Sequence, residues 1–140
     1  MGTRASYKFR EKSSKGGYDN EVCNVYFQYD GYPKGHPLDA CKWMKRGKVV
    51  SEYNTTNDLI FNGVGCLTAQ FINKFKEGVG NVYINSLKYW GKCSEDYLYE
   101  VIVTDYKTIE FVAYRMDYTI NKFVEFFRGS PKEYFKKYSA

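Results

Sequence analysis

Histidine, proline and cysteine are scarce in this sequence, which has one histidine, three prolines and four cysteines. Cys23, Cys41, Cys66 and Cys93 lie far apart and form no Cys-x-x-Cys pair. That spacing is typical neither of a zinc ribbon nor of a redox dithiol. We therefore expect no metal site and no cofactor, and we expect the thiols to be free.

Long apolar runs are also missing. No stretch of the sequence approaches the ~20 apolar residues that a membrane helix requires. The first residues, Met-Gly-Thr-Arg-Ala-Ser-Tyr-Lys, show no apolar signal region. We expect a soluble cytoplasmic protein that has no membrane partner.

Aromatic residues are abundant, at 19% with 15 tyrosines and 10 phenylalanines, and they favour strands and an aromatic core. Tyrosine, asparagine, lysine and phenylalanine together are typical of an AT-rich genome, so a phage is a plausible source and the host cytoplasm the expected location. The net charge of +5 comes from 21 basic and 16 acidic residues spread along the chain. This spread indicates solubility rather than a nucleic-acid partner.

The length of 140 residues predicts one domain, 1–140. Periodicity and turn residues indicate an α+β fold, with a mostly antiparallel sheet covered by two helices and a short C-terminal helix. Ser130, Pro131 and Glu133 predict a capping box for that last helix. Residues 49–58 are expected to be an exposed loop. The expected strands are 6–12, 21–29, 79–86, 97–104, 108–116 and 122–128, and the two longer helices are expected at 37–46 and 67–75.

Residues 28–37, Gln-Tyr-Asp-Gly-Tyr-Pro-Lys-Gly-His-Pro, concentrate unusual residue types between a strand and a helix. Tyr29 and Tyr32 can stack on a planar ring, while Gln28 and Asp30 can bond to its edge. The glycines let the backbone approach a ligand closely. The alternative is a tight turn that needs these residues only for its shape. We interpret this 28–37 loop as a site loop.

His36 is the only ordinary general base near neutral pH in the chain. It also stands where a helix cap is expected, which is the structural alternative. Residues 62–66 form a second glycine-rich turn before a helix, where Gly63 and Gly65 leave backbone amides free for a phosphate or carboxylate. Cys66 in the first turn of that helix is placed as nucleophilic thiols are, although a buried structural cysteine is the alternative.

Three segments carry a resemblance: Met-Gly-Thr-Arg at the start, Gln-Tyr-Asp-Gly-Tyr-Pro-Lys-Gly-His from position 28, and Asn-Gly-Val-Gly-Cys-Leu-Thr-Ala-Gln from position 62. Together they resemble a small, largely uncharacterised family seen in bacteria, their phages and some large viruses. Pro37 departs from it, because a second glycine is usual there. The resemblance implies no established reaction. It marks as site candidates Arg4, Gln28, Tyr29, Asp30, Tyr32, His36, Asn62 and Cys66.

We predict a binding protein that sequesters a nucleotide-derived, phosphate-bearing defence signal without cleaving it, by analogy with phage sponge proteins. The tyrosines would stack on a base, Asp30 and Asn62 would bond to base or ribose, and Arg4 with the amides of 63–66 would hold phosphate. The two glycine-rich loops are expected to meet at one end of the sheet, or across the interface of a homo-oligomer.

Two alternatives stay open. The first is a hydrolase or transferase in which Cys66 is the nucleophile, His36 its base, and Asp30 or Gln28 the residue that orients the base. The second is an interaction module that inhibits a host protein through exposed aromatic side chains.

Overall fold

A computed structural model describes residues 2–50 and 59–140. Within these ranges, six strands form one sheet in the order β5-β2-β1-β6-β7-β8, and β3 and β4 pair separately. The strands are β1 (Ala5–Lys12), β2 (Asp19–Phe27), β3 (Lys48–Val50), β4 (Ile60–Asn62), β5 (Val82–Asn85), β6 (Tyr97–Thr104), β7 (Thr108–Asp117) and β8 (Lys122–Gly129). The helices are α1 (His36–Met44), α2 (Gly63–Phe75), α3 (Pro131–Tyr138) and the short 3₁₀ helix η1 (Leu87–Tyr89).

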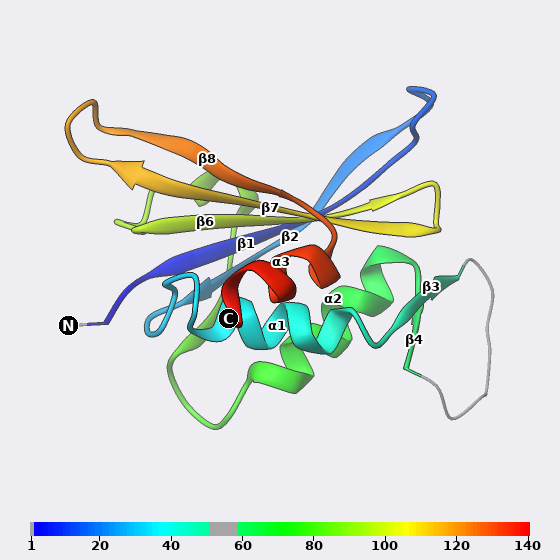
Figure 1. The fold of residues 1–140 in the computed structure, drawn as a ribbon, viewed down its shortest axis with the longest axis horizontal. Helices are drawn as coiled ribbons and strands as arrows, with labels where there is room; N and C mark the ends of the chain where they lie inside the picture. The colour runs from blue at the N-terminus through cyan, green and yellow to red at the C-terminus, as the bar shows by residue number, and fades with distance from the viewer. Residues whose placement is uncertain (1, 51–58) are drawn as a thin grey trace.

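The fold is α+β, as predicted, and Figure 1 shows α1, α2 and α3 on the same face of the sheet. All neighbouring strands of the large sheet run antiparallel except β1 and β6, which are parallel. The parallel pair lies at the centre of the sheet, so the earliest strand in the chain is an interior one. Local sequence patterns do not reveal this pairing, because its two partners are separated by most of the chain.

The core lies between the sheet and the three helices and is built largely from aromatic rings. Tyr7 and Phe9 of β1 are fully buried, and the Phe71 ring of α2 lies 5.0 Å from the ring of each. Val25 and Phe27 of β2 are buried on the same side, as their alternation predicts. Strand formation and core packing therefore use the same side chains.

Several boundaries differ from the expected ones: β2 ends at Phe27 and α1 at Met44, each two residues early, β4 was not expected, and three further differences have a local cause. β5 is confined to Val82–Asn85 because Gly80 and Asn81 adopt positive φ angles of 83° and 62°, which interrupt an extended strand. α2 begins at Gly63, so most of the predicted 62–66 turn is helical. β3 takes up the start of the loop expected at 49–58, and the remainder, 51–58, lies outside the described residues.

The capping box of α3 is confirmed. The Ser130 hydroxyl accepts a hydrogen bond from the Glu133 N–H at 3.1 Å, and the Glu133 carboxylate accepts one from the Ser130 N–H at 2.8 Å. This reciprocal pair fixes the point at which β8 turns back under the sheet into α3.

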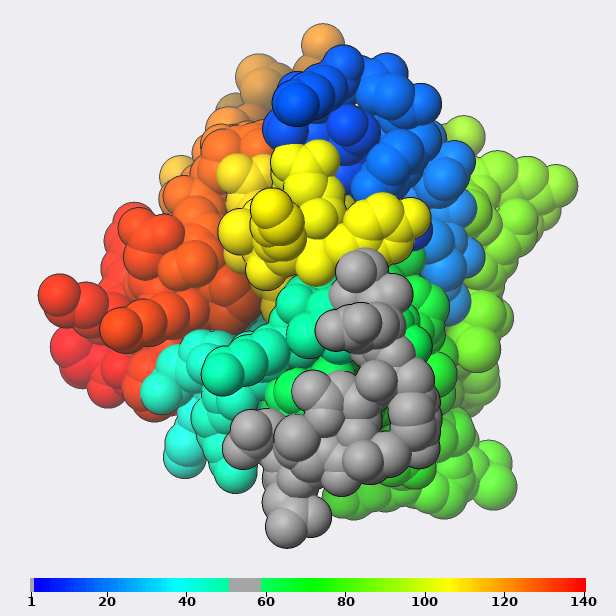
Figure 2. Space-filling model, turned by 90° about the vertical axis from the view of Figure 1, so that its right-hand side faces the viewer, coloured from blue at the N-terminus to red at the C-terminus, as the bar shows by residue number. Residues whose placement is uncertain are grey.

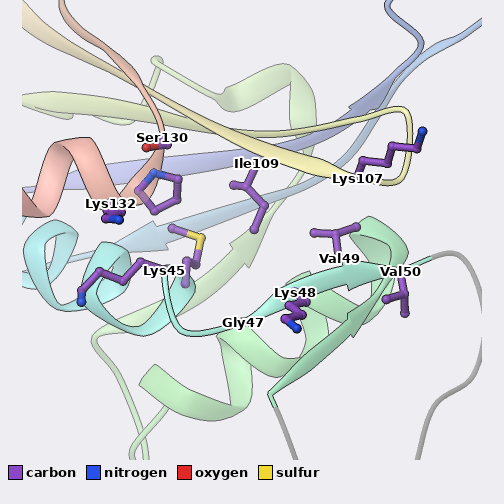
Figure 3. A pocket seen from close by; sticks show the side chains of 11 residues that line it. Lys45, Gly47, Lys48, Val49, Val50, Lys107, Ile109, Ser130 and Lys132 are labelled. Atoms are coloured by element: carbon purple, nitrogen blue, oxygen red, sulfur yellow. The ribbon is translucent and has the colours of Figure 1, made fainter.

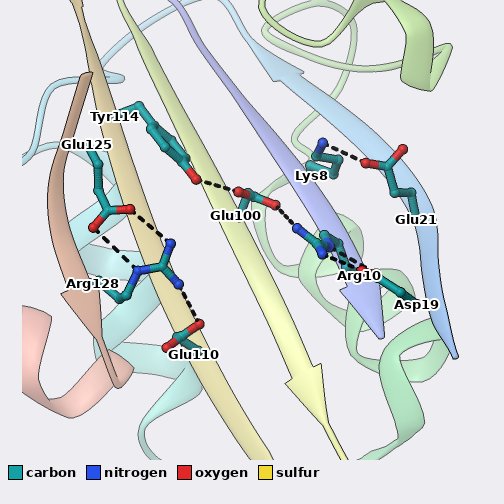
Figure 4. A network of polar contacts seen from close by, with 9 residues as sticks. All are labelled: Lys8, Arg10, Asp19, Glu21, Glu100, Glu110, Tyr114, Glu125 and Arg128. Carbon is teal, nitrogen blue, oxygen red and sulfur yellow. Dashed lines mark hydrogen bonds and ion pairs between the residues drawn. The ribbon is translucent and has the colours of Figure 1, made fainter. Parts of the chain in front are cut away.

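The face of the sheet opposite the helices carries a polar network (Figure 4). Glu100 of β6 is only 5% exposed, and its carboxylate accepts hydrogen bonds from Arg10 at 2.8 Å and from the Tyr114 hydroxyl at 2.6 Å. Glu125 of β8 instead pairs with Arg128 near solvent. The buried carboxylate ties β1, β6 and β7 together across the centre of the sheet.

Replacing Glu100 by glutamine is expected to lower the free energy of unfolding by about 2–3 kcal/mol, because a neutral amide weakens the hydrogen bonds from the Tyr114 hydroxyl and from Arg10, which is partly buried and also pairs with Asp19. The matched variant Glu125→Gln is expected to cost about 0–1 kcal/mol, because its ion pair is solvated. Urea denaturation of both variants measures the difference. Equal losses would contradict the central role of Glu100.

Candidate functional site

The 28–37 loop is the hydrogen-bonding partner of three tyrosines in the core. A buried hydroxyl without a partner costs about 1–3 kcal/mol, so each of these contacts matters for stability. The hydroxyls come from β1, β6 and α3, and they reach consecutive parts of one loop. The pairs are Tyr7 Oη with His36 Nδ1 at 2.7 Å, Tyr99 Oη donating to Gly31 O at 2.7 Å, and Tyr134 Oη donating to Pro33 O at 2.9 Å.

Close packing against β1 explains the glycine at position 31. A Cβ atom there would lie 2.6 Å from the Ala5 Cβ, and the Gly31 N–H donates to the Thr3 carbonyl at 3.0 Å. Asp30, with a φ of 59°, accepts a hydrogen bond from the His36 N–H through its carbonyl at 2.9 Å. These contacts favour the alternative considered from the sequence, a tight turn whose residues serve its shape.

His36 is the first residue of α1, one position later than a cap, and Gly35 is the N-cap. Its ring is 9% exposed and stacks on Phe27 with the ring centroids 3.9 Å apart. Burial lowers the pKa of His36 to about 3, so the imidazole is neutral at physiological pH. Among the described residues its Nε2 has no hydrogen-bond partner. Enclosed in this way, His36 is a core residue and not a base presented to a ligand.

The other predicted residues near this loop are exposed or serve backbone contacts. Tyr29 and Tyr32 are exposed, as is Asp30. The Gln28 side chain accepts a hydrogen bond from the Asn81 N–H at 2.9 Å and so joins the loop to the segment before β5. Arg4 is also exposed, and its carbonyl accepts from the Asp96 N–H at 2.9 Å.

Within one chain the two glycine-rich segments do not meet. Phe27, which stacks on His36, also contacts Phe75 at the end of α2, with ring centroids 6.1 Å apart. The second segment begins α2, so the 13 residues of that helix, about 18 Å, separate the two. Figure 1 shows them at opposite ends of the helical layer. Their meeting across an interface between two copies stays a prediction.

Cys66 and His36 are also separated by the length of α2, because His36 packs near the end of that helix and Cys66 lies in its first turn. Cys66 lies about 13 Å along α2 from Phe75, on the 1.5 Å rise per residue of a helix. Its sulfur instead faces Gln70 on the next turn, whose Nε2 lies 3.1 Å away. Asn62 and Gly65 are exposed, and no atom lies within 4 Å of a Cβ built on Gly65. The nucleophile and base of the enzymatic alternative are not brought together in this chain.

A different group of residues forms the best candidate site. A groove of about 580 Å³ lies where the end of α1, β3, the β6–β7 turn and the start of α3 come together. Figure 2 shows these segments bordering one another in teal, yellow and orange. Four lysines from these four segments line the groove: Lys45, Lys48, Lys107 and Lys132. We call this the lysine groove.

The walls between the lysines are apolar. Met44 and Pro131 are buried, Val49 and Ile109 are half-buried, and Figure 3 shows the last two facing one another across the groove. The volume is within the usual range of about 300–1,000 Å³ for small-molecule sites. An apolar wall rimmed by cations suits a ligand that has both an apolar body and a negative charge.

The lysines of the groove have no ion-pair partner in the part of the chain that the structure describes. Within residues 2–50 and 59–140, no acidic side chain is among the lining residues. The Lys45 Nζ lies 4.9 Å from the centroid of the Phe135 ring, so this side chain extends toward α3. Ser130 also lines the groove, and since its oxygen already accepts from Glu133, its O–H can still donate to an anion.

Sequence analysis missed this groove. Only the cluster Lys45-Arg46-Gly47-Lys48 gave a local signal, and it is ordinary for a helix end. Lys107 and Lys132 belong to a turn and a helix start that are remote in the sequence.

Comparisons of the chain with protein-family models, curated proteins and solved structures find no match. In the described part of the chain, no helix is long and apolar enough to cross a membrane. The same part contains no cluster of three or more His, Cys, Asp or Glu side chains that could hold a metal ion.

Exposed apolar side chains occur at β5 and η1, where Tyr83, Ile84 and Tyr89 face solvent. Inhibition of a host protein through such residues stays a prediction.

Gly31 and Gly65, one glycine from each glycine-rich segment, should respond oppositely to alanine. Gly31→Ala is expected to lower the free energy of unfolding by about 1–3 kcal/mol, because its methyl group overlaps Ala5. Gly65→Ala is expected to raise it by about 0.5–1 kcal/mol, because alanine is the better helix former and the site is open. Thermal and urea unfolding measure both changes. A loss of ligand binding in Gly65→Ala would instead support a site at residues 62–66.

Burial of the single histidine gives a pH dependence. The unfolded chain binds a proton at His36 near pH 6.5, whereas the folded chain does so only near pH 3, where its lowered pKa lies. The unfolded state is therefore favoured as pH falls through this window, and stability is full above pH 6.5. Between pH 7 and pH 5 the loss is about 2 kcal/mol at 1.36 kcal/mol per unit.

NMR can follow this imidazole without assignment, because the chain has one histidine. Its signal in the folded protein is expected to stay constant from pH 7 to pH 5, and to titrate near pH 6.5 in urea. A folded-state midpoint near 6.5 would show that the ring is solvated.

Proposed function

We propose that this protein binds an anionic, nucleotide-derived small molecule in the lysine groove and holds it intact. The proposal rests on one partly apolar groove that is lined by four lysines, Lys45, Lys48, Lys107 and Lys132. Phosphate would contact the lysine ammonium groups, and the base would lie on the apolar walls. The proposed location therefore moves from the two glycine-rich segments to the other end of α1.

Sequestration rather than turnover is supported by the side chains around the groove. Its described lining offers lysines, one serine and apolar groups, but neither a histidine nor a cysteine. The serine hydroxyl is engaged in the cap of α3, and no general base among the lining residues is positioned to activate it. A phage that encodes this protein would use it to withhold a defence signal from its receptor, which is the biological setting we propose.

The double variant Lys107→Gln/Lys132→Gln tests the proposal. It is expected to weaken nucleotide binding at least about tenfold, because each charge-assisted contact contributes about 1.5 kcal/mol or more. Isothermal titration calorimetry with a panel of linear and cyclic nucleotides measures affinity. Mass spectrometry of the material released on heating is expected to show the ligand unchanged.

The matched control is Lys92→Gln/Lys122→Gln, which removes the same charge from two exposed positions that do not line the groove. This control is expected to bind within about twofold of the wild-type affinity, since separated surface charges are screened by salt. Equal weakening in the two double variants would contradict a defined site. Altered products after incubation would contradict sequestration.

A further inference from the structure

Three of the four lysines of the groove lie at its two ends. Figure 3 shows Lys45 and Lys132 together at the α1 and α3 end, and Lys107 at the other end on the β6–β7 turn. Ile109 lies between the two ends, and Lys48 extends from β3 below it. The groove thus has cations at both ends and apolar side chains, with one further lysine, between them.

The sheet register gives the separation of the ends. Gly129, which directly precedes Ser130 and α3, pairs with Phe111 of β7. Lys107 lies four residues before Phe111, so the backbone positions of the two ends are about 13 Å apart at 3.3 Å per residue. Figure 3 shows the side chains of Lys45 and Lys107 extending away from one another, so in these conformations the two ends offer separate places for an anion.

We propose that the ligand carries two separated anionic groups, one for each end of the groove, as in a dinucleotide whose phosphates lie on successive nucleosides. This inference rests on the proposed function and narrows its ligand class. Lys45, Lys132 and the Ser130 hydroxyl hold one phosphate. Lys107 holds the other, and Met44, Val49 and Ile109 contact the base of the nucleoside between the two phosphates.

Three adenine nucleotides distinguish the effect of where the phosphates lie from the effect of how many there are. The dinucleotide pApA carries phosphates on successive nucleosides, ADP carries two adjacent phosphates, and AMP carries one. Isothermal titration calorimetry is expected to show pApA binding at least about tenfold more tightly than either ADP or AMP, which corresponds to one added charge-assisted contact.

The variant Lys107→Gln identifies the second end. It is expected to bring the ratio of pApA to AMP affinity close to one, whereas the control Lys122→Gln is expected to keep the wild-type ratio. Circular dichroism and thermal unfolding check that both variants are folded. Equal affinity of wild-type protein for pApA and ADP, or an unchanged ratio in Lys107→Gln, would overturn the two-ended site and leave the proposed function standing. No binding of any of the three probes would overturn both.

Discussion

The structure depends on partners for the tyrosine hydroxyls in its core. Tyr7, Tyr99 and Tyr134 bring large apolar rings, but each also brings an O–H that must be hydrogen-bonded once water is excluded. One loop supplies all three partners, through the His36 ring and two backbone carbonyls. Because the tyrosines belong to β1, β6 and α3, the loop fixes the sheet and the last helix relative to one another. α1 begins at His36, so the same contacts also set where that helix lies.

The lysine groove is a consequence of this arrangement at the opposite end of α1. The end of α1 and its C-cap bring Met44 and Lys45 to the place where α3 begins and β7 starts, and β3 adds Lys48. None of these lysines is required by the core, and all are exposed. The two ends of α1 therefore differ. Near its start, polar groups form hydrogen bonds with the core tyrosines, and near its end, exposed lysines line the groove.

Several elements followed directly from the sequence because their signals are local. The β6 and β7 strands, the alternation of Val25 and Phe27, and the capping box at Ser130 each depend on neighbours a few residues away. The parallel pairing of β1 with β6 and the lysine groove depend on segments about 90 residues apart, and no local pattern encodes them. The 28–37 loop was recognised as unusual, but its composition alone does not distinguish a turn that binds tyrosine hydroxyls from one that binds a ligand. The structure shows the tyrosine contacts of Gly31, Pro33 and His36, and ligand binding by the exposed Tyr29, Asp30 and Tyr32 stays a prediction.

The central position of β1 also constrains how the protein is made. During synthesis β1 and β2 can form a hairpin early, but the other edge of β1 waits for β6 at residues 97–104. Closing so long a loop is entropically costly and slows folding. Until then the growing chain displays an open strand edge and the rings of Tyr7 and Phe9, which are the surfaces that aggregation and chaperones recognise. The core is completed only after α3 has been synthesised, because Tyr134 belongs to that helix.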